Sequence, residues 1–411
     1  METEAAPTRL RRLLFLRSGA PLALALGLLG LAAWAATPRA GDALTADRFS
    51  RACNALEAGD LNSAAQDLRA LREANPELAE VRLLESLLTL RRERPSLGWL
   101  DAFVQAWNST GRPDFSDSRL LPRQFPPEGS GSEEAVLRTG SAETELMLAL
   151  SLAPNAERAR LILQHLRKLD PPELIFAAND SLRHESLPTA LRAQASRALR
   201  ARLSELTVAS PRAMQYPTLL LVGGSSPEAP FTAQDLQALE AIAALPDWRE
   251  TDFHTLYQRG FRHFEAAGNS QPASAAFMLA VMSLASEPAY LLFKRAEASR
   301  DTLSSAELHR LGDALWRIGS RMAEESTILE RMVGTRLMID GASLLGDKAR
   351  LQQASALREE GAAARSAMTQ ATPERWPLRS LNQAFIDAMT RDEVGCILRF
   401  RPPSSVPGDA P

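Results

Sequence analysis

Apolar residues recur every three or four positions over much of this chain, and this spacing restricts its fold more than any other feature of the sequence. Residues 49–76 show this pattern in two successive stripes, each followed by residues that end a helix. The first apolar stripe consists of Phe49, Ala52, Cys53 and Leu56, and the second consists of Leu61, Ala64, Ala65, Leu68 and Leu71. Gly59-Asp60 separates the stripes, and Asn75-Pro76 ends the second because proline cannot continue a helical turn. The pattern predicts two amphipathic helices that fold back as an antiparallel hairpin.

The composition is that of a helical protein. Of the 411 residues, 45% are hydrophobic, and most of these are Ala and Leu. The residues that favour sheets, such as Val, Ile, Thr and Tyr, are comparatively scarce. A chain of this length has room for two or three domains with large cores. This composition predicts an all-α fold. The net charge of −3 gives no bulk positive field, so we expect no nucleic acid among the partners of the chain.

The stretch 55–76 resembles the second half of a tetratricopeptide repeat. The residues that carry the resemblance are Gly59, Asp60, Leu61, Ala64, Leu68 and Pro76. In that family a small residue at the place of Ala64 lets the two helices approach closely, and the proline closes the repeat. The first half departs from the family, because Arg48 and Arg51 stand where large apolar residues are usual. One repeat cannot bury its own apolar face, so the resemblance implies further hairpins stacked beside it.

Further helices are predicted along most of the chain. Residues 44–107 hold the first hairpin and a degenerate second one, residues 133–397 form a helical array, and residues 256–288 within that array are another candidate hairpin. The other segments with helical periodicity are 133–152, 155–169, 171–182, 187–206, 347–369 and 376–390. Capping boxes mark two helix starts, the first made by Thr232 with Asp235 and the second by Ser304 with Glu307.

Three segments lack helical periodicity. Residues 108–132 are rich in Pro, Gly and Ser, and a loop of this length is either functional or a linker. Residues 216–230 form a second interruption, in which the stretch 219–226 reads as the end of a helix or short strand before a Gly-rich turn. Residues 398–411 are predicted to be a disordered tail.

The N-terminus predicts a membrane segment. Residues 1–18 carry a basic cluster made of Arg9, Arg11, Arg12 and Arg17. An uncharged apolar run follows from Gly19 to Ala36, and a helix of 18 residues is about 27 Å long, close to the thickness of a bilayer core. The arginines are expected to stay in the cytoplasm, which places the rest of the chain on the other side. Because the Arg-rich, Lys-poor usage is typical of bacteria, that side is expected to be the periplasm.

A cleaved signal peptide is the alternative interpretation of the same run. Residues 19–36 could form its apolar part, and Ala33-Trp34-Ala35 provides a small-residue cleavage site. The two interpretations differ in whether the mature protein is an inner-membrane protein or a soluble one. Both take the bulk of the chain out of the cytoplasm.

No pattern of residues points to a metal or cofactor. The five histidines are His165, His184, His254, His263 and His309, and none has the spacing of a zinc ligand set. Asp114 and Asp117 lack the spacing and the glycine of a calcium loop. The stretch 219–226 is neither a phosphate-binding P-loop nor a nucleophile elbow. We expect structural or solvated roles for all of them.

The arginine runs and the two cysteines also have plain interpretations. Residues 91–94 and 197–202 could bind phosphates or an acidic partner, but they lack a neighbouring aromatic platform and are expected to be solvated helix faces. Cys53 lies on an apolar stripe and Cys396 precedes the Pro-rich tail. Two isolated thiols are expected rather than a disulfide.

One fragment resembles an enzyme family. Residues 325–338 are faintly similar to a segment of the lytic transglycosylases, and the resemblance implies a catalytic acid at Glu325. The Gly-Leu-Met-Gln motif of that family is absent, and the interval is too short. An apolar stripe through Ile328, Met332 and Val333 instead predicts a structural helix.

The sequence therefore predicts an all-α protein in which one N-terminal transmembrane helix precedes stacked helical hairpins, arranged as a solenoid or as bundles. No catalytic, cofactor-binding or metal-binding residues are assigned. Stacked hairpins expose a surface suited to other proteins, so we expect a non-catalytic scaffold that faces the periplasm, binds protein partners and contacts the bilayer through residues 19–36. A cell-wall-active enzyme that uses Glu325 and a secreted soluble binding module remain as alternatives.

Overall fold

A computed structural model describes residues 40–122, 141–224, 226–269, 272–371 and 375–401. Within these ranges the regular secondary structure is helical, and an isolated bridge between Ala213 and Asp247 is formed without a strand. This confirms the all-α prediction for the described part of the chain. The predicted transmembrane run, the end of the 108–132 loop and most of the predicted tail lie outside the described residues. The chain divides into two compact units, residues 1–96 and 97–411.

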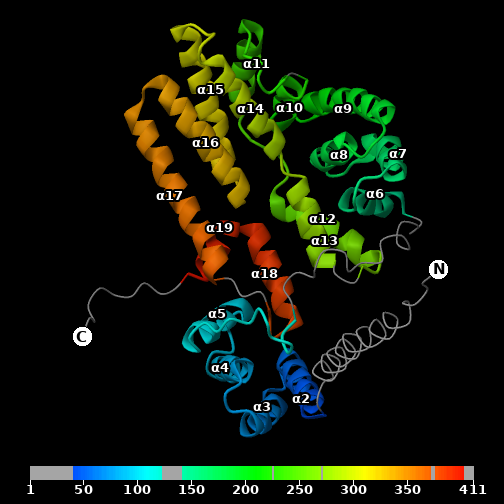
Figure 1. The fold of residues 1–411 in the computed structure, drawn as a ribbon, viewed down its shortest axis with the longest axis vertical. Coiled ribbons are helices and arrows are strands. Elements are labelled where there is room, and N and C mark those ends of the chain that lie inside the picture. The colour runs from blue at the N-terminus through cyan, green and yellow to red at the C-terminus, as the bar shows by residue number, and fades with distance from the viewer. Residues whose placement is uncertain (1–39, 123–140, 225, 270–271, 372–374, 402–411) are drawn as a thin grey trace, which may run out of the picture. The chain divides into compact units, whose positions relative to one another are not determined.

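The first unit contains the predicted hairpin. Its helices are α2 (Ala40–Glu57), α3 (Leu61–Ala74) and α4 (Ala79–Glu93) (Figure 1). Gly59 has a φ of +77°, a conformation that favours glycine, and it lets the chain reverse direction after α2. Asp60 then caps α3 by accepting a hydrogen bond from Ser63 N over 3.1 Å. Ala64 is fully buried, as close packing of the two helices requires.

The second unit contains the remaining helices (Figure 1). Its first half consists of α5 (Trp99–Ser109), α6 (Ala142–Ser151), α7 (Ala156–His165), the 3₁₀ turn η1 (Leu166–Lys168), α8 (Leu174–Arg183), α9 (Thr189–Ala209), α10 (Gln215–Val222) and α11 (Ala233–Ala243). Its second half consists of α12 (Phe253–Ala266), α13 (Pro272–Met282), α14 (Ser286–Ser299), α15 (Ser305–Ala323), α16 (Ile328–Leu345), α17 (Lys348–Ala371), α18 (Arg379–Arg391) and α19 (Glu393–Leu398). Both predicted capping boxes are present, at the starts of α11 and α15.

Helices α15 and α16 pack closely through glycines. Gly312 faces Gly341, and Gly319 faces Gly334, so each helix presents two glycines seven residues apart. A Cβ atom on Gly341 would lie 2.6 Å from the carbonyl oxygen of Gly312, closer than non-bonded atoms can approach. The two backbones are therefore in direct contact, which no other residue type would allow at these positions.

The predicted interruption at 216–230 is partly wrong. Residues 215–222 form α10, and the irregular segment begins only at Gly223. The buried side chain of Arg295 on α14 holds this segment. Its guanidinium donates hydrogen bonds to the carbonyl oxygens of Leu221, Ala229 and Pro230 and to the Asp235 carboxylate, at 2.8–3.3 Å. One side chain thus satisfies backbone groups that a helix would otherwise have satisfied.

Two further boundaries differ from the sequence interpretation. Pro288, expected to close the 256–288 hairpin, lies in the first turn of α14, where its missing N–H costs no helical bond. The loop predicted from residue 108 begins after Ser109, where α5 ends, and is packed as far as Leu121. Phe115 and Leu121 are buried, and Arg375 Nε donates to the carbonyl oxygen of Ser116 over 2.9 Å. This bond and one of 2.8 Å from Trp376 N to the carbonyl oxygen of Pro122 attach the start of the loop to the chain before α18.

Among the described residues, the stretch Pro272–Ser299 is long and apolar enough to cross a bilayer. It comprises α13 and α14, and 53% of its apolar window is buried inside the fold. Core helices of globular proteins meet the same criterion of length and composition. Packing inside the second unit explains the apolar character of this stretch.

Candidate functional site

A groove of about 190 Å³ lies between α16 and α17, and α19 closes part of it. Its apolar lining consists of Ala323, Met332, Ile339, Leu357, Gly361 and Val394. Its polar lining consists of Arg331, Thr335, Arg336, Arg358, Glu360 and Arg365. Helices α16 and α17 run beside each other from the turn at Gly346, and α19 lies near the far end of α17 (Figure 1). All of these elements belong to the second unit.

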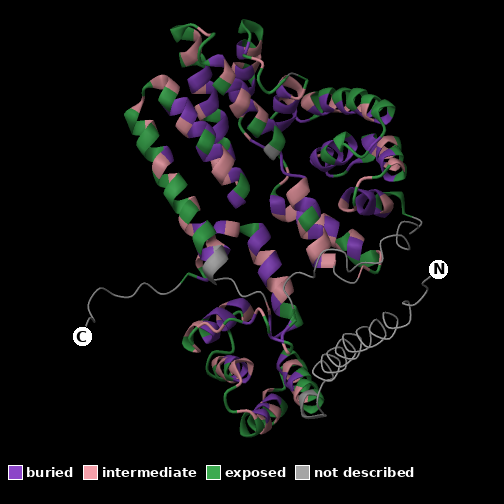
Figure 2. Cartoon of the chain, in the orientation of Figure 1, coloured by how far each residue is buried: buried purple, intermediate pink, exposed green. Residues whose placement is uncertain are grey.

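The groove exists because α17 packs on the fold through small side chains. Its buried residues with described side chains are Ala354, Ala364 and Ala367, and Figure 2 shows that most of the remaining helix is exposed or half-buried. Alanines cannot fill the space between two helices, whereas a Leu or Phe would. Gly361 leaves the middle of the groove open, because a Cβ atom there would meet only Met332 Cγ, at 3.8 Å.

Positive charge surrounds this apolar floor. Arg331 and Arg336 come from α16, and Arg358 and Arg365 come from α17, against the single acidic side chain of Glu360 in the lining. Arg331 donates to the carbonyl oxygen of Glu325 over 2.8 Å, and its charge also acts on the carboxyl of Glu393. Arg336 is paired with Asp340 on its own helix at 3.0 Å. The lining itself thus contains four arginines and one glutamate, and carboxylates outside the lining interact with some of these arginines.

The arrangement supplies contact and charge for binding. Met332, Ile339 and Leu357 offer apolar surface to a ligand, and the guanidiniums offer directed hydrogen-bond donors to carboxylates. Guanidiniums stay protonated at physiological pH, so they serve poorly as proton-transfer groups.

Glu325, the acid that the enzyme resemblance implied, lies in the turn between α15 and α16. Its carboxylate accepts a hydrogen bond from Arg249 Nε over 2.9 Å. The same guanidinium lies 3.2 Å from Glu330, whose side chain is fully buried. Thr327 Oγ1 donates to Glu330 over 2.8 Å. These contacts place Glu325 in an ion-pair cluster that joins the turn before α16 to residue 249 in the α11–α12 connection.

Burial dominates the electrostatics of this cluster. It raises the pKa of Glu330 to about 7 even though Arg249 opposes the change. It also raises the pKa of Glu325, with Arg249 again acting in the other direction. A raised carboxyl pKa is common at catalytic sites, but a general acid must also reach its substrate. Here the carboxylate of Glu325 is engaged by a buried guanidinium, with 2% of the Arg249 side chain exposed.

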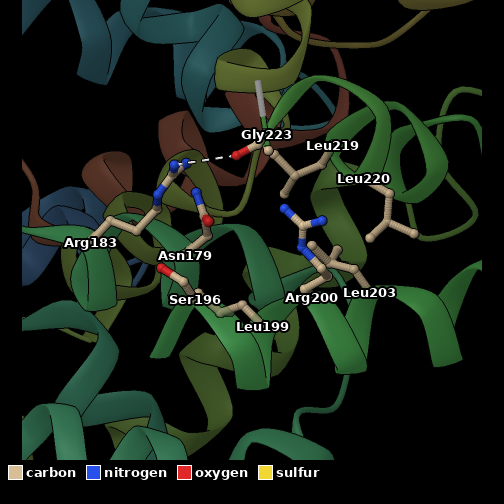
Figure 3. A pocket seen from close by; sticks show the side chains of 10 residues that line it. Asn179, Arg183, Ser196, Leu199, Arg200, Leu203, Leu219, Leu220 and Gly223 are labelled. Atoms are coloured by element: carbon tan, nitrogen blue, oxygen red, sulfur yellow. Dashed lines mark hydrogen bonds between the residues drawn. The ribbon is translucent and has the colours of Figure 1, made fainter. Parts of the chain in front are cut away.

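A second, smaller pocket of about 60 Å³ brings together parts of two segments, 197–202 and 219–226. Figure 3 shows Arg183 of α8 and Arg200 of α9 at the C-terminal end of α10. Arg183 donates to the carbonyl oxygen of Gly223 over 3.4 Å, and a Cβ atom on Gly224 would overlap the guanidinium of Arg200. Arg183 is also paired with Glu287 at 3.0 Å. Cations at the C-terminus of a helix stabilise its dipole, which accounts for this pocket.

Three of the histidines and Asp114 have local structural partners. His254 Nδ1 lies 2.9 Å from Thr390 Oγ1, and His263 Nε2 lies 3.0 Å from Glu143. His184 Nδ1 lies 2.8 Å from Ser186 Oγ, and Asp114 accepts from Ser116 N over 2.9 Å in a turn. Throughout the described ranges, no three His, Cys, Asp or Glu side chains are grouped closely enough to hold a metal ion.

Cys53 and Cys396 are both free thiols, as the sequence analysis expected. Burial raises the pKa of each to about 12. A thiol of this kind is almost entirely protonated at neutral pH and is a poor nucleophile.

Sequence reasoning missed the residues of the groove. Arg331, Arg336, Arg358 and Arg365 resemble ordinary solvated arginines, because nothing in the sequence shows which helix lies opposite them. The one available signal was the Ala-rich content of 348–371, which implied a loosely filled helix interface. A scan against protein-family models found no match, and searches of curated proteins and of solved structures also found none.

Proposed function

We propose that this chain is a non-catalytic helical adaptor that binds a partner protein and is anchored by its N-terminus to the inner membrane, facing the periplasm. The observation that carries the binding part is the arginine-lined apolar groove between α16 and α17. It offers apolar contact area and directed cationic donors together, which is how helical proteins hold peptide segments.

The membrane part of the proposal rests on the sequence alone. The Arg-rich residues 1–18 and the apolar run 19–36 support an anchor whose C-terminal side faces outward. Two experiments test it. Mass spectrometry of the mature N-terminus distinguishes an intact anchor from cleavage near Ala36. Protease treatment of spheroplasts should degrade residues 40–411 of the full chain without breaking the inner membrane, and full protection would contradict the proposed orientation.

Site-specific crosslinking in cells tests the adaptor role. A photoreactive residue at Leu357, in the groove, should crosslink reproducibly to one protein or a few proteins. The same residue at Arg197, on the exposed face of α9, should not. If neither position, nor a set of positions spread over the described surface, gives a reproducible protein adduct, the adaptor proposal fails.

An assay of peptidoglycan solubilisation tests the alternative, a catalytic role. Purified full-length chain should not solubilise peptidoglycan. Solubilisation that disappears in Glu325→Gln would overturn the non-catalytic role, since Gln keeps the shape of the Glu325 side chain and removes only its acid.

A further inference from the structure

Two carboxyl groups share one guanidinium at the start of α16. Glu325 lies in the turn between α15 and α16, Glu330 lies in the first turn of α16, and Arg249 comes from the connection between α11 and α12. Together they form the Arg249 cluster. We infer that this cluster is a pH-sensitive contact, which holds the start of α16 to the α11–α12 connection while it carries a proton and opens when the proton is lost.

The charges of the cluster balance only when one carboxyl group is protonated. With both carboxyl groups ionised, the single guanidinium leaves one negative charge in excess. The side chains are largely removed from water, with exposed fractions of 2% for Arg249, 19% for Glu325 and 0% for Glu330. An uncompensated charge in such surroundings is costly, because the fold supplies no water to solvate it. One bound proton removes this cost.

The geometry identifies Glu330 as the group that holds the proton. Arg249 Nε donates a hydrogen bond to Glu325 over 2.9 Å. Arg249 Nη2 lies 3.2 Å from Glu330 but has no hydrogen-bond acceptor among the described residues. Burial, opposed by Arg249 and assisted by the charge of Glu325, raises the pKa of Glu330 to about 7. The cluster should therefore lose its proton close to neutral pH.

Two further acidic groups act on the cluster through Glu325. They are Asp252, the N-cap of α12, and Glu324, which precedes Glu325 and pairs with Arg321 on α15 at 3.0 Å. Burial raises the pKa of Glu325, Arg249 lowers it, and the charges of Asp252 and Glu324 raise it again. Both groups add to the negative charge and so make full ionisation of the cluster less favourable.

Helix α19 brings another carboxyl group to the start of α16, and this one has partners of its own. Glu393 accepts a 2.6 Å hydrogen bond from Ile328 N, and its N–H donates to the carbonyl oxygen of Ser326 over 3.1 Å. Partial burial raises the pKa of Glu393, whereas the bond from Ile328 and the charge of Arg331 lower it. These contacts attach the turn to α19, on the side away from Arg249.

The cluster joins two irregular segments, so it can open without unfolding a helix. The α11–α12 connection is held on α10, because Met214 N donates to the carbonyl oxygen of Asp247 over 2.9 Å and Gln215 N donates to that of Trp248 over 3.2 Å. The turn at 324–327 belongs to the other side of the cluster. Separating the two segments would admit water to Glu330, and local openings of this kind cost less than unfolding the whole unit.

Linkage gives the direction and size of the pH effect. In the open form Glu330 is hydrated and has its ordinary pKa of 4.5, whereas in the closed form its pKa is about 7. The closed form therefore binds the proton more strongly, and acid favours it. From pH 6 to pH 8 the ratio of open to closed molecules should rise about 10-fold.

Hydrogen–deuterium exchange followed by mass spectrometry tests this on the full-length chain in phosphatidylcholine nanodiscs. Exchange rates at pH 6 and pH 8 are corrected for the intrinsic effect of pH on amide exchange and expressed as protection factors. The variants are Glu330→Gln, Glu325→Gln and the control Glu324→Gln, which removes an exposed carboxyl group from the same turn. Circular dichroism checks that each variant keeps its helix content.

In the wild type, the protection factor of residues 324–330 should fall about 10-fold from pH 6 to pH 8 and should be lower at both pH values than that of residues 312–319 in α15. Glu330→Gln should remove most of this fall. Glu325→Gln should reduce it, because the guanidinium is then left with one carboxylate. Glu324→Gln should keep it.

A protection factor that does not change with pH in the wild type would overturn the inference, and so would an equal fall in Glu330→Gln. Equal protection of residues 324–330 and 312–319 would also overturn it, since the cluster would then open only when the whole unit unfolds. The measurement involves no ligand, so its outcome is independent of the proposed adaptor role.

Discussion

Gly319 and Gly334 face each other across α15 and α16 so closely that a Cβ atom on Gly319 would lie 2.5 Å from the carbonyl oxygen of Gly334. The reverse distance, from a Cβ on Gly334 to the carbonyl oxygen of Gly319, would be 2.6 Å. The backbones leave no room for any side chain here. This contact holds α15 and α16 together and fixes the position of α16, which forms one wall of the groove.

Gly334→Ala is expected to destabilise the second unit by about 2–4 kcal/mol, because the new methyl group forces two backbones apart. Gly361→Ala is the matched control, since the added methyl group has space there. It should stabilise α17 by about 0.5–1 kcal/mol through its higher helix propensity. Urea unfolding of the two variants measures both changes. Equal effects of the two substitutions would contradict the close backbone contact.

Glu330→Gln should change how stability depends on pH. The pKa of Glu330 is about 7 in the folded protein and 4.5 as its ordinary value, so the folded state holds an extra proton between these two pH values. Wild-type stability therefore falls as pH rises through this window, and the variant lacks this loss. Relative to wild type, Glu330→Gln should gain about 2 kcal/mol between pH 5 and pH 8.

The control for this titration is Glu324→Gln, in the connection that precedes α16. Glu324 is largely exposed and pairs with Arg321 at 3.0 Å, so its removal should shift stability by less than about 1 kcal/mol at either pH. Urea unfolding at pH 5 and pH 8 gives both values. An unchanged difference between wild type and Glu330→Gln at the two pH values would show that burial does not perturb this carboxyl.

Arg295→Lys should destabilise the second unit by about 2–4 kcal/mol. The guanidinium of Arg295 reaches three carbonyl oxygens and Asp235 from one planar group, and an ammonium cannot reproduce that geometry. Arg310→Lys is the control, because Arg310 pairs with Glu240 at the surface and its replacement should cost less than about 1 kcal/mol. Thermal unfolding compares them, and hydrogen exchange should show selective loss of protection around residues 221–235 in Arg295→Lys.

Native Cys53 and Cys396 should react with iodoacetamide at pH 8 at least about a hundredfold more slowly than in urea, because burial raises the pKa of both thiols to about 12. Mass spectrometry of alkylated peptides over time measures each rate separately. Fast labelling of either cysteine in the native chain would mean that its thiol is more open to solvent than the structure indicates.

Local signals in the sequence predicted local structure well. The break at Gly59-Asp60 and the capping boxes that begin at Thr232 and Ser304 act within one helical turn, so the sequence carries all the information they need. The free thiols were expected because Cys53 lies on an apolar stripe and Cys396 precedes the Pro-rich tail. The resemblance of residues 55–76 to a tetratricopeptide repeat implies an array of several stacked hairpins. The sequence of one hairpin does not determine how the others are arranged.

Features that depend on distant segments were missed. Each glycine of α15 and α16 resembles a weak point in its own helix, and its role appears only when the partner helix is known. Nothing in the sequence indicated that Arg249 and Arg295 are buried; each has 2% of its side chain exposed, because acceptors from other segments surround it. The groove was missed for the same reason, since its two walls are separate helices.

The seven-residue spacing of the glycine pairs also limits how the length of this region can vary. One residue inserted between Gly312 and Gly319 would turn all later positions of α15 by about 100° and bring a larger side chain against α16. Insertions and deletions in homologous chains are therefore expected in the connections at 300–304 and 324–327 and should be rare between the paired glycines. The register of these two helices is set by backbone contact, and a change in chain length would disturb it more than most substitutions of single side chains.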